Sequence, residues 1–365
     1  ITSRAWRLVY WSWRSLNINM EYPSLNTAKA GAIRFNTDSS QLEIYDGNQW
    51  VGVEATSPFL QTGGTRGLLA GGYSPTPNNA NRDYIDQINL NTIGNAIDFG
   101  NLTDGRRPGQ NAAGSRTRAI WMGGRASPLN KNVIDFVTIA QQGNATDFGD
   151  LLTGRGSFAV VSSATRGICA LGSATISPSD AAHTNVIEYV TISQTGNAVD
   201  FGDGLTNAFK PTGAQSQTRG LFMGGYTPTE INTIQYITMS TLGNSADFGD
   251  LTSTRRGAAG GGNSVRAICA GGERYPSSLA VQTIDFITIS TLGNSQDFGD
   301  SITGVGRGGS VNSPTRMVFN VGNYNSSPSG LEFIQIMSTG NASDFGNLAN
   351  GRWGPAGTSN GHGGL

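Results

Sequence analysis

Short runs of β-branched and aromatic residues recur along the chain, each bounded by glycine, asparagine, aspartate or serine. One such run, IDFVTI, begins at Ile134. Similar runs begin at Ile85, Ile187, Ile234, Ile284 and Leu331. Short apolar runs between turn residues predict β-strands, and no helical periodicity competes with them. We therefore expect an all-β protein.

Two other phrases recur with these runs and define a repeated unit. The first is a Thr-Arg (once Val-Arg) followed by apolar residues and usually a glycine pair, as in TRAIWMGG from Thr117. The second is GNATDFGDL from Gly143, and its close copies begin at Gly94, Gly196, Gly243, Gly293 and Gly340. The start of each IDFVTI-type run lies 14 residues before the phenylalanine of Asp-Phe-Gly in all six units. Most length variation falls between the Thr-Arg phrase and the IDFVTI-type run, which indicates one variable loop per unit.

Each unit of about 50 residues contains four predicted strands. They are a run of small residues such as GSFAVVSSA from Gly156, the Thr-Arg run, the IDFVTI-type run and the Asp-Phe-Gly segment. Four-stranded units repeated radially form a β-propeller. The tail after the sixth Asp-Phe-Gly has room for one more small-residue strand, so we expect residues 352–359 to complete the sheet that begins at Thr65. The pattern predicts a six-bladed β-propeller, and a seventh blade from the N-terminal segment is the alternative.

The first 58 residues lack this repeat, so we expect two domains, 1–58 and 59–365. Between Asn26 and Val53 apolar and polar residues alternate around two turns, which predicts a small β-meander. A small meander buries little surface alone, so we expect it to pack on another chain, with packing on the propeller as the alternative. The candidate attachment residues are Trp6, Trp11, Trp13, Phe35, Tyr45 and Trp50.

The composition narrows the class of partner. The chain has 52 glycines among 365 residues, 13% charged residues and a net charge of −1. The glycine content suits many tight turns, and the charge balance provides no overall attraction for nucleic acid. No apolar stretch is long enough for a membrane helix, so we expect no membrane insertion. Arginines interrupt every apolar stretch near the start, so we expect no secretory signal there.

Few residues are available for catalysis or metal binding. The two histidines are His183 and His362, and we expect the two cysteines, Cys169 and Cys269, to be buried apolar residues. This inventory is poor for a His/Cys metal site or a Ser-His-Asp triad, so we expect no metal, no cofactor and no enzymatic activity. Glycosidase chemistry needs two carboxylates, and that alternative stays open, although no carboxylate departs clearly from the repeat.

One arginine and one aspartate occupy fixed positions in every unit. The arginines are Arg66, Arg118, Arg166, Arg219, Arg266 and Arg316. The aspartates are Asp98, Asp147, Asp200, Asp247, Asp297 and Asp344. Because all six copies agree, we expect structural Arg–Asp pairs within or between units. An anion-binding ring of arginines or calcium-binding aspartates is the functional alternative.

The variable segments are rich in Tyr, Asn, Ser, Thr and Pro, which suit adaptable polar recognition on a rigid scaffold. We expect them to share one face and to bind a ligand, with solvated loops of no binding role as the alternative. The candidate ligand-binding residues are Tyr73, Asn78, Arg125, Asn130, Tyr226, Tyr275 and Tyr324.

The units resemble kelch-like propellers, which have a hydrophobic strand ending in Gly-Gly, a variable loop and then an aromatic-containing strand. They depart from the usual kelch pattern, because the GN-x-x-DFG phrase replaces the tryptophan expected later in each unit. The wording TRG…GGY, IDFITI and GNATDFGDL is similar to repeat proteins of bacteriophages, cyanophages in particular. In the first domain, GAIRFNTD followed by LEIYDGNQW resembles a module of phage tail-fibre and other virion proteins.

These resemblances imply a virion structural protein, such as a tail fibre or spike, that contacts other virion proteins through residues 1–58 and forms a homo-oligomer, most simply a trimer. Its propeller would bind a host-surface glycan or protein. One alternative is a capsid decoration, collar or tail component without a receptor. Another is a secreted bacterial lectin or glycan-processing propeller.

Overall fold

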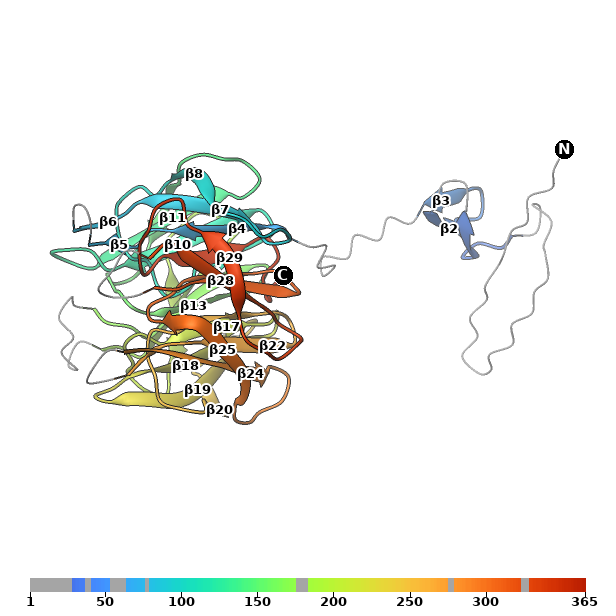
Figure 1. Ribbon diagram of the computed structural model, residues 1–365. Coiled ribbons are helices and arrows are strands. Elements are labelled where there is room, and N and C mark those ends of the chain that lie inside the picture. The colour runs from blue at the N-terminus through green and yellow to red at the C-terminus, as the bar shows by residue number, and fades with distance from the viewer. Residues whose placement is uncertain are drawn as a thin grey trace. The chain divides into compact units, whose positions relative to one another are not determined.

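The structure is a computed structural model that describes residues 28–36, 41–52, 64–75, 79–174, 183–274, 279–322 and 328–365 (Figure 1). These ranges contain strands and turns and no helix, so the protein is all-β, as the sequence predicts. The chain divides into two compact units, Ile1–Leu60 and Gln61–Leu365. Each unit is described by itself.

The first unit contains a three-stranded antiparallel meander of β1 (Ile33–Asn36), β2 (Gln41–Tyr45) and β3 (Trp50–Gly52). Arg34 lies opposite Glu43, and its Nε donates to the Glu43 carboxylate at 2.6 Å. The Arg34 guanidinium also lies 4.2 Å from the Trp50 ring centre. Cross-strand pairs of this kind stabilise a small sheet, and the predicted meander is confirmed.

This meander exposes most of its apolar side chains. Phe35 is 54% exposed, and Leu42, Val51, Ile33 and Ile44 are also exposed. A three-stranded sheet cannot bury both of its faces within itself, so these side chains are available for contact with another surface.

Six antiparallel sheets of four or five strands, together with one short two-stranded sheet, make up the described part of the second unit. The first contains β30 (Ala356–Ser359), β4 (Arg66–Ala70), β7 (Tyr84–Asn89) and β8 (Ile97–Asn101). The second contains β9 (Ala113–Gly114), β10 (Arg118–Gly124), β11 (Lys131–Thr138) and β12 (Thr146–Asp150). The third contains β13 (Ala159–Ser162), β14 (Arg166–Ala170), β15 (Val186–Thr191) and β16 (Val199–Asp203).

The remaining three sheets repeat this order. The fourth contains β17 (Thr212–Gln215), β18 (Arg219–Tyr226), β19 (Glu230–Thr238) and β20 (Ala246–Asp250). The fifth contains β21 (Ala259–Gly262), β22 (Arg266–Ala270), β24 (Leu279–Thr288) and β25 (Gln296–Val305), with β23 (Glu273–Arg274) also paired to β24. The sixth contains β26 (Ser310–Asn312), β27 (Arg316–Asn320), β28 (Gly330–Gln335) and β29 (Ser343–Asn347), and a short separate pair joins β5 (Tyr73–Ser74) to β6 (Ala80–Asn81).

The first strand of each sheet is buried and made of small residues. These strands, β9, β13, β17, β21, β26 and β30, contact one another in chain order, and β30 also contacts β9. A larger residue would not fit where they meet, since a Cβ on Gly260 would lie 2.4 Å from the Gly213 carbonyl oxygen. We call this set the ring of first strands. As the sequence predicts, the C-terminal strand β30 pairs with β4 and completes the sheet that the N-terminal end of the unit begins.

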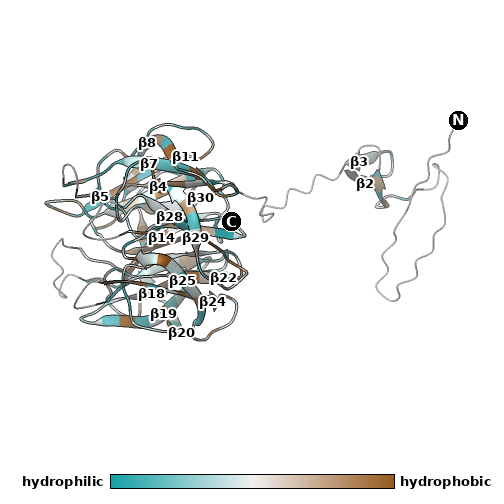
Figure 2. Ribbon diagram, viewed as in Figure 1, coloured by the Kyte–Doolittle hydropathy of each residue, from teal (hydrophilic) through white to brown (hydrophobic). Residues whose placement is uncertain are grey.

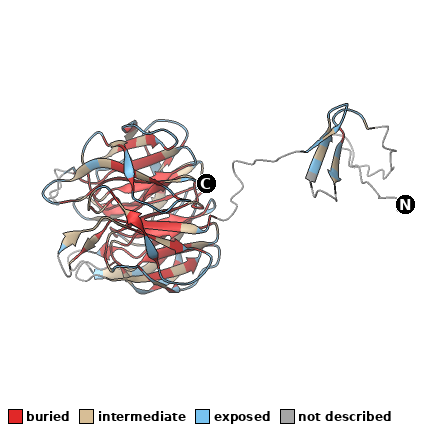
Figure 3. Ribbon diagram, turned by 90° about the horizontal axis from the view of Figure 1, so that it is seen from above, coloured by how far each residue is buried: buried red, intermediate tan, exposed pale blue. Residues whose placement is uncertain are grey.

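Apolar side chains from neighbouring sheets fill the spaces between them. In one such cluster Ile134 and Phe148 of the second sheet pack with Val160 and Cys169 of the third. Both cysteines are buried and free, as expected, and burial raises the pKa of the Cys269 thiol to about 12. Figure 2 shows hydrophobic stretches along the strands, and Figure 3 shows that buried residues occupy the interior of the unit.

The repeated GN-x-x-DFG phrase links each sheet to the next. The Gly143 amide donates to the Phe99 carbonyl at 3.0 Å, and the Asn144 side chain accepts from the Asn101 amide at 3.1 Å. The same link recurs between all successive sheets, and Asn95 of the first sheet accepts from Asn347 of the last at 3.0 Å. The phrase is therefore an inter-sheet connection.

The predicted pairing of the repeated arginines with the Asp-Phe-Gly aspartates is wrong. All twelve residues are described, and no ion pair joins the two sets; the aspartates are exposed. Each arginine instead donates to a main-chain carbonyl of the next sheet. The donor–acceptor pairs are Arg66–Ile139, Arg118–Ile192, Arg166–Met239, Arg219–Ile289, Arg266–Ile336 and Arg316–Leu90. Five of these guanidinium groups also lie over an aromatic ring of their own sheet, as Arg118 does over Phe136 at 4.9 Å.

A different set of repeated residues forms the buried ion pairs. Seven residues after each Asp-Phe-Gly phenylalanine the chain has Arg106, Arg155, Ala208, Arg255, Val305 and Arg352. Each of the four arginines pairs with an acidic residue, which is the second residue of the IDFVTI-type run in the sheet whose first strand follows the arginine. The pairs are Arg106–Asp135, Arg155–Glu188, Arg255–Asp285 and Arg352–Asp86. In the fourth sheet the arginine is replaced by Ala208 and the acid by Gln235, so both charges are absent together.

Candidate ligand-binding pocket

The segments that enter the first strands come together at one end of the ring. We number their residues from the Asp-Phe-Gly phenylalanine. Position eight holds Arg107, Gly156, Phe209, Arg256, Gly306 and Trp353, and position nine holds Pro108, Ser157, Lys210, Gly257, Arg307 and Gly354. Main-chain bridges join position eight to residues that follow the second strands, such as Tyr73 to Trp353 and Arg107 to Arg125. The variable segments therefore begin beside this end of the ring.

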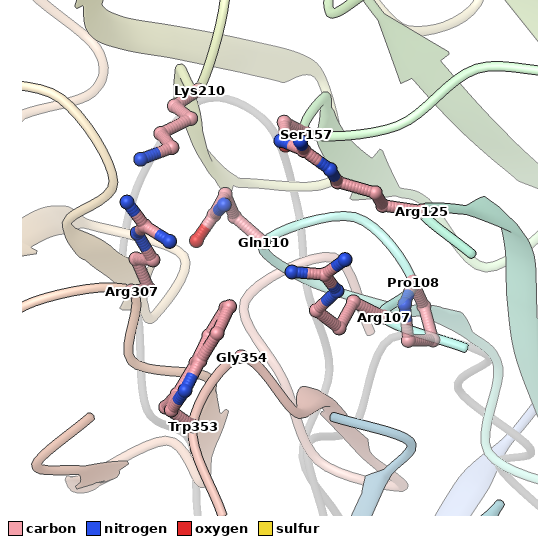
Figure 4. Close-up of a pocket in the computed structure, with 9 residues that line it drawn as sticks. All are labelled: Arg107, Pro108, Gln110, Arg125, Ser157, Lys210, Arg307, Trp353 and Gly354. Atoms are coloured by element: carbon pink, nitrogen blue, oxygen red, sulfur yellow. The ribbon is translucent and has the colours of Figure 1, made fainter. Parts of the chain in front are cut away.

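A small pocket of about 30 Å³, partly open to solvent, lies among these residues (Figure 4). We call it the cationic pocket. It is lined by Arg107, Pro108, Gln110, Arg125, Ser157, Lys210, Arg307, Trp353 and Gly354. Figure 4 shows the ends of Lys210 and Arg307 close to each other and the Arg107 side chain between Trp353 and Arg125. Four of the nine lining residues are cationic, and none of the nine is acidic.

The carboxylate that neutralises part of this charge is buried beside the pocket. Glu273 accepts from Lys210 Nζ at 2.8 Å, and it forms ion pairs with Arg307, whose Nε lies 2.6 Å away, and with Arg256, whose Nε lies 3.7 Å away. Burial opposes ionisation of Glu273, but Lys210 and Arg307 hold the pKa of its carboxyl below the ordinary value. Burial and the neighbouring Arg307 charge lower the pKa of Lys210 to about 7, against the opposing effect of Glu273. Among the residues that the structure describes, the four cationic side chains of the lining outnumber Glu273.

Position nine has a backbone conformation that favours glycine. The φ angles of Gly257 and Gly354 are +65° and +69°. Ser157, Lys210 and Arg307 adopt the same left-handed conformation, with φ angles of 57°, 55° and 59°. A non-glycine residue in this region costs on the order of 1 kcal/mol or more and is concentrated at functional sites. Lys210 and Arg307 thus carry long cationic side chains at a place where the fold accepts glycine.

Aromatic rings hold the arginines of the pocket in place. The Arg107 guanidinium lies 5.1 Å from the Tyr73 ring centre and 5.0 Å from the Trp353 ring centre. The Arg307 guanidinium also lies 5.0 Å from the Trp353 ring centre. Trp353 is only 3% exposed, so it acts as a support for the two guanidinium groups. Beside the pocket, the His183 ring stacks on Phe209 at 5.3 Å.

The structure brings part of the predicted ligand-binding set together. Arg125 lines the cationic pocket, and Tyr73 contacts Arg107 at its edge. Tyr226 lies next to this site, with the Arg256 guanidinium 4.9 Å from its ring centre. Asn130 donates to the Ser173 carbonyl at 2.8 Å. The other predicted residues lie outside the described ranges: Asn78, Tyr275 and Tyr324 of the variable segments, and Trp6, Trp11 and Trp13 of the attachment segment.

Sequence reasoning missed the residues that dominate the pocket, Arg107, Lys210, Arg307 and Trp353. A signal for them exists, because positions eight and nine differ among units whose neighbouring positions repeat closely. A functional site in a repeat protein is a local departure from the repeat, and these positions satisfy that criterion.

The C-terminal tail closes the opposite end of the ring. The tail residue His362 is buried, and its imidazole lies 2.9 Å from the Gly114 carbonyl oxygen and 3.3 Å from the Gln215 side-chain nitrogen. Burial lowers the pKa of His362 to about 4, although the contact with Gly114 opposes this. Gly114 and Gln215 end first strands, whereas the pocket lies where first strands begin. Figure 1 shows the C-terminus and the β5–β6 pair at different ends of the unit.

Within the described ranges, no three His, Cys, Asp or Glu side chains are grouped in a way that could hold a metal ion. The same ranges contain no helix that could cross a membrane. No protein-family model matches the chain, and no curated protein matches it.

Proposed function

We propose that the six sheets are the blades of a β-propeller and that the chain is a bacteriophage virion protein whose propeller binds a receptor on the host surface. The continuous contacts among the first strands, including that of β30 with β9, support a closed propeller. The Arg316–Leu90 and Asn347–Asn95 hydrogen bonds join the last sheet to the first and support the same arrangement.

The observation that carries the binding role is the cationic pocket. Lys210 and Arg307 keep an unfavourable backbone conformation at a position where other units have glycine. Lys210 and Arg307 form ion pairs with the buried Glu273, and because they also line the pocket we assign them a second role in binding a ligand. The pocket also adjoins the variable segments, which supply adjustable contacts around a fixed centre.

Attachment to the particle is assigned to residues 1–58. The exposed Phe35, Leu42 and Val51 of the meander are suited to contact with other virion proteins or with further copies of the chain, for which a trimer is our proposal. The resemblance of this segment to tail-fibre modules gives the same assignment. The virion location and the receptor are therefore assigned to different units.

Cell binding by the full-length chain tests this function. Fluorescently labelled protein is mixed with bacteria that the parent particle infects, and saturable staining is expected. Substitution of Tyr73 and Tyr226 by alanine should reduce staining at least tenfold, whereas Phe35→Ser in the meander should leave it unchanged. Absence of staining on every such host, with folded protein confirmed by circular dichroism, would refute receptor binding and favour a capsid, collar or tail component without a receptor.

A further inference from the structure

We propose that the cationic pocket binds an acidic sugar unit of a surface polysaccharide, with Arg107, Lys210 and Arg307 contacting its anionic group. The assignment to a polysaccharide rests on the proposed receptor-binding function, whereas the assignment to an anion rests on the pocket alone.

The charge distribution selects an anion. Four cationic side chains line the pocket, and the buried Glu273 lies behind Lys210 and Arg307. Among the described residues no acidic side chain lines the pocket, and partly desolvated cations interact with an incoming anion more strongly than exposed ones do. An anionic group placed between Arg107 and Arg307 would contact this cationic lining.

The geometry of the side chains selects a planar or tetrahedral oxyanion. Arg107 and Arg307 present guanidinium groups that are both fixed against Trp353, at 5.0 Å from its ring centre. A guanidinium group can donate two parallel hydrogen bonds to a carboxylate or a phosphate, and Lys210 adds a point charge. Because Trp353 fixes both groups before binding, little side-chain entropy is lost when the anion binds.

The surroundings of the pocket favour a sugar as the carrier of this anion. Tyr73 and Tyr226 are partly exposed near the pocket, where the variable segments begin. The sequence of these segments is rich in Tyr, Asn, Ser and Thr. Rings and hydroxyl or amide groups of this kind contact the apolar faces and hydroxyls of a saccharide. The partial opening to solvent leaves room for a chain to continue beyond the bound unit.

The repeat itself supplies a well-matched variant. Arg307→Gly converts position nine to the residue found at Gly257 and Gly354, so the backbone conformation is retained while the guanidinium is removed. Arg107→Gln changes a different sheet and serves as the second variant if Arg307→Gly does not fold. Lys131→Gln removes an exposed charge that pairs with Asp104 outside the pocket, and it is the control for long-range electrostatics.

Calorimetric titration of the full-length protein with trigalacturonate, at low and constant ionic strength, tests the proposal. Trigalacturonate is expected to bind at least tenfold more tightly than its methyl ester, which has the same sugars and no charge. Arg307→Gly and Arg107→Gln should each weaken binding at least tenfold, and Lys131→Gln should change it less than twofold.

Three results would overturn the proposal. Equal binding of the acid and its ester would exclude an anion site, as would unchanged binding in both pocket variants. Equal binding of triglutamate or inorganic phosphate would exclude a polysaccharide site and leave a peptide site or a simple anion site. Failure of cell staining together with specific trigalacturonate binding would refute receptor binding while keeping the pocket, so the two proposals fail separately.

Discussion

The buried pair of Arg255 and Asp285 offers a quantitative test of how the repeat is stabilised. Both side chains are fully buried, and the Asp285 carboxylate also accepts from the Thr252 amide at 2.9 Å and from Ser295 Oγ at 2.9 Å. In the fourth sheet the corresponding positions are Ala208 and Gln235. The variant pair Arg255→Ala and Asp285→Gln therefore copies a combination that the protein already uses.

The single substitution Arg255→Ala should be far more harmful than the double one. Removing one partner of a buried ion pair leaves an uncompensated charge and costs about 3–5 kcal/mol of unfolding free energy. In the double variant a neutral glutamine replaces the carboxylate. It should accept from the amide of Thr252 and from Ser295, as Gln235 accepts from the Leu205 amide at 2.8 Å and from Ser245 at 2.6 Å.

The double variant still loses the hydrogen bonds of Arg255 to main-chain carbonyls, of which that to Thr283 is 3.0 Å long. We assign this loss about 1–2 kcal/mol. The expected interaction energy between the two substitutions is then at least about 2 kcal/mol, within the range seen for contacting residues.

Urea unfolding of the wild type, both single variants and the double variant measures this energy. Tryptophan fluorescence and circular dichroism should be followed together, because a repeat protein need not unfold in one step. Additive effects of the two substitutions, or a cost below 1 kcal/mol for Arg255→Ala, would refute the view that charge compensation is what the pair provides.

Three further predictions follow from the inter-sheet connection, the tail and the pocket. Gly149→Ala should destabilise the protein by more than about 1 kcal/mol in urea unfolding, because the added Cβ would lie 2.4 Å from the Gly196 carbonyl oxygen. Gly94→Ala should be tolerated, because no atom lies within 4 Å of the added Cβ, and similar effects of the two substitutions would refute this prediction. Because burial in the folded state lowers the pKa of His362 from 6.5 to about 4, the free energy of unfolding should fall by about 3 kcal/mol as pH decreases from 6.5 to 4. Urea unfolding of His362→Gln across that range should lack this pH dependence, and identical pH profiles of the variant and the wild type would contradict the burial argument. Because the pKa of Lys210 is about 7, trigalacturonate affinity should decrease between pH 6 and pH 8 in calorimetry, and a pH-independent affinity would exclude Lys210 as a contact.

The strands and their order were predictable because the repeat specifies them several times over. Apolar runs, turn residues and a constant spacing of 14 residues occur in all six units, so an ambiguity in one unit is resolved by the others. The short tail after the last Asp-Phe-Gly indicated that a strand was missing from the first sheet. The pairing of β30 with β4 confirms that inference.

The Arg–Asp prediction failed because the occurrence of one arginine and one aspartate in each unit does not specify the direction in which each side chain points. In a strand, neighbouring side chains point to opposite faces, and Phe99 is buried while Asp98 beside it is exposed. Application of this alternation to the Asp-Phe-Gly strand would have excluded a buried role for the aspartate. The partner of Arg106 is instead Asp135, which lies 29 residues further along the chain in the same sheet.

The cationic pocket could not be predicted because its members come from five of the six units. Arg107 and Arg307 are 200 residues apart in the sequence, and the packing of the first strands against one another brings both guanidinium groups to the Trp353 side chain. Variation at positions eight and nine is visible in the sequence, but the end of the ring to which these positions belong is known only from the structure.

The C-terminal tail occupies one end of the ring of first strands. His362 contacts Gly114 and Gln215 where first strands end, and Gly363 and Gly364 fit closely enough that an added Cβ would meet main-chain atoms there. Under the proposed function a ligand approaches from the other end, where the cationic pocket lies and the variable segments begin. Insertions in those segments can change the contacts around the pocket without disturbing the inter-sheet connections, because the Asp-Phe-Gly phrase and the repeated arginines form those connections elsewhere in each sheet.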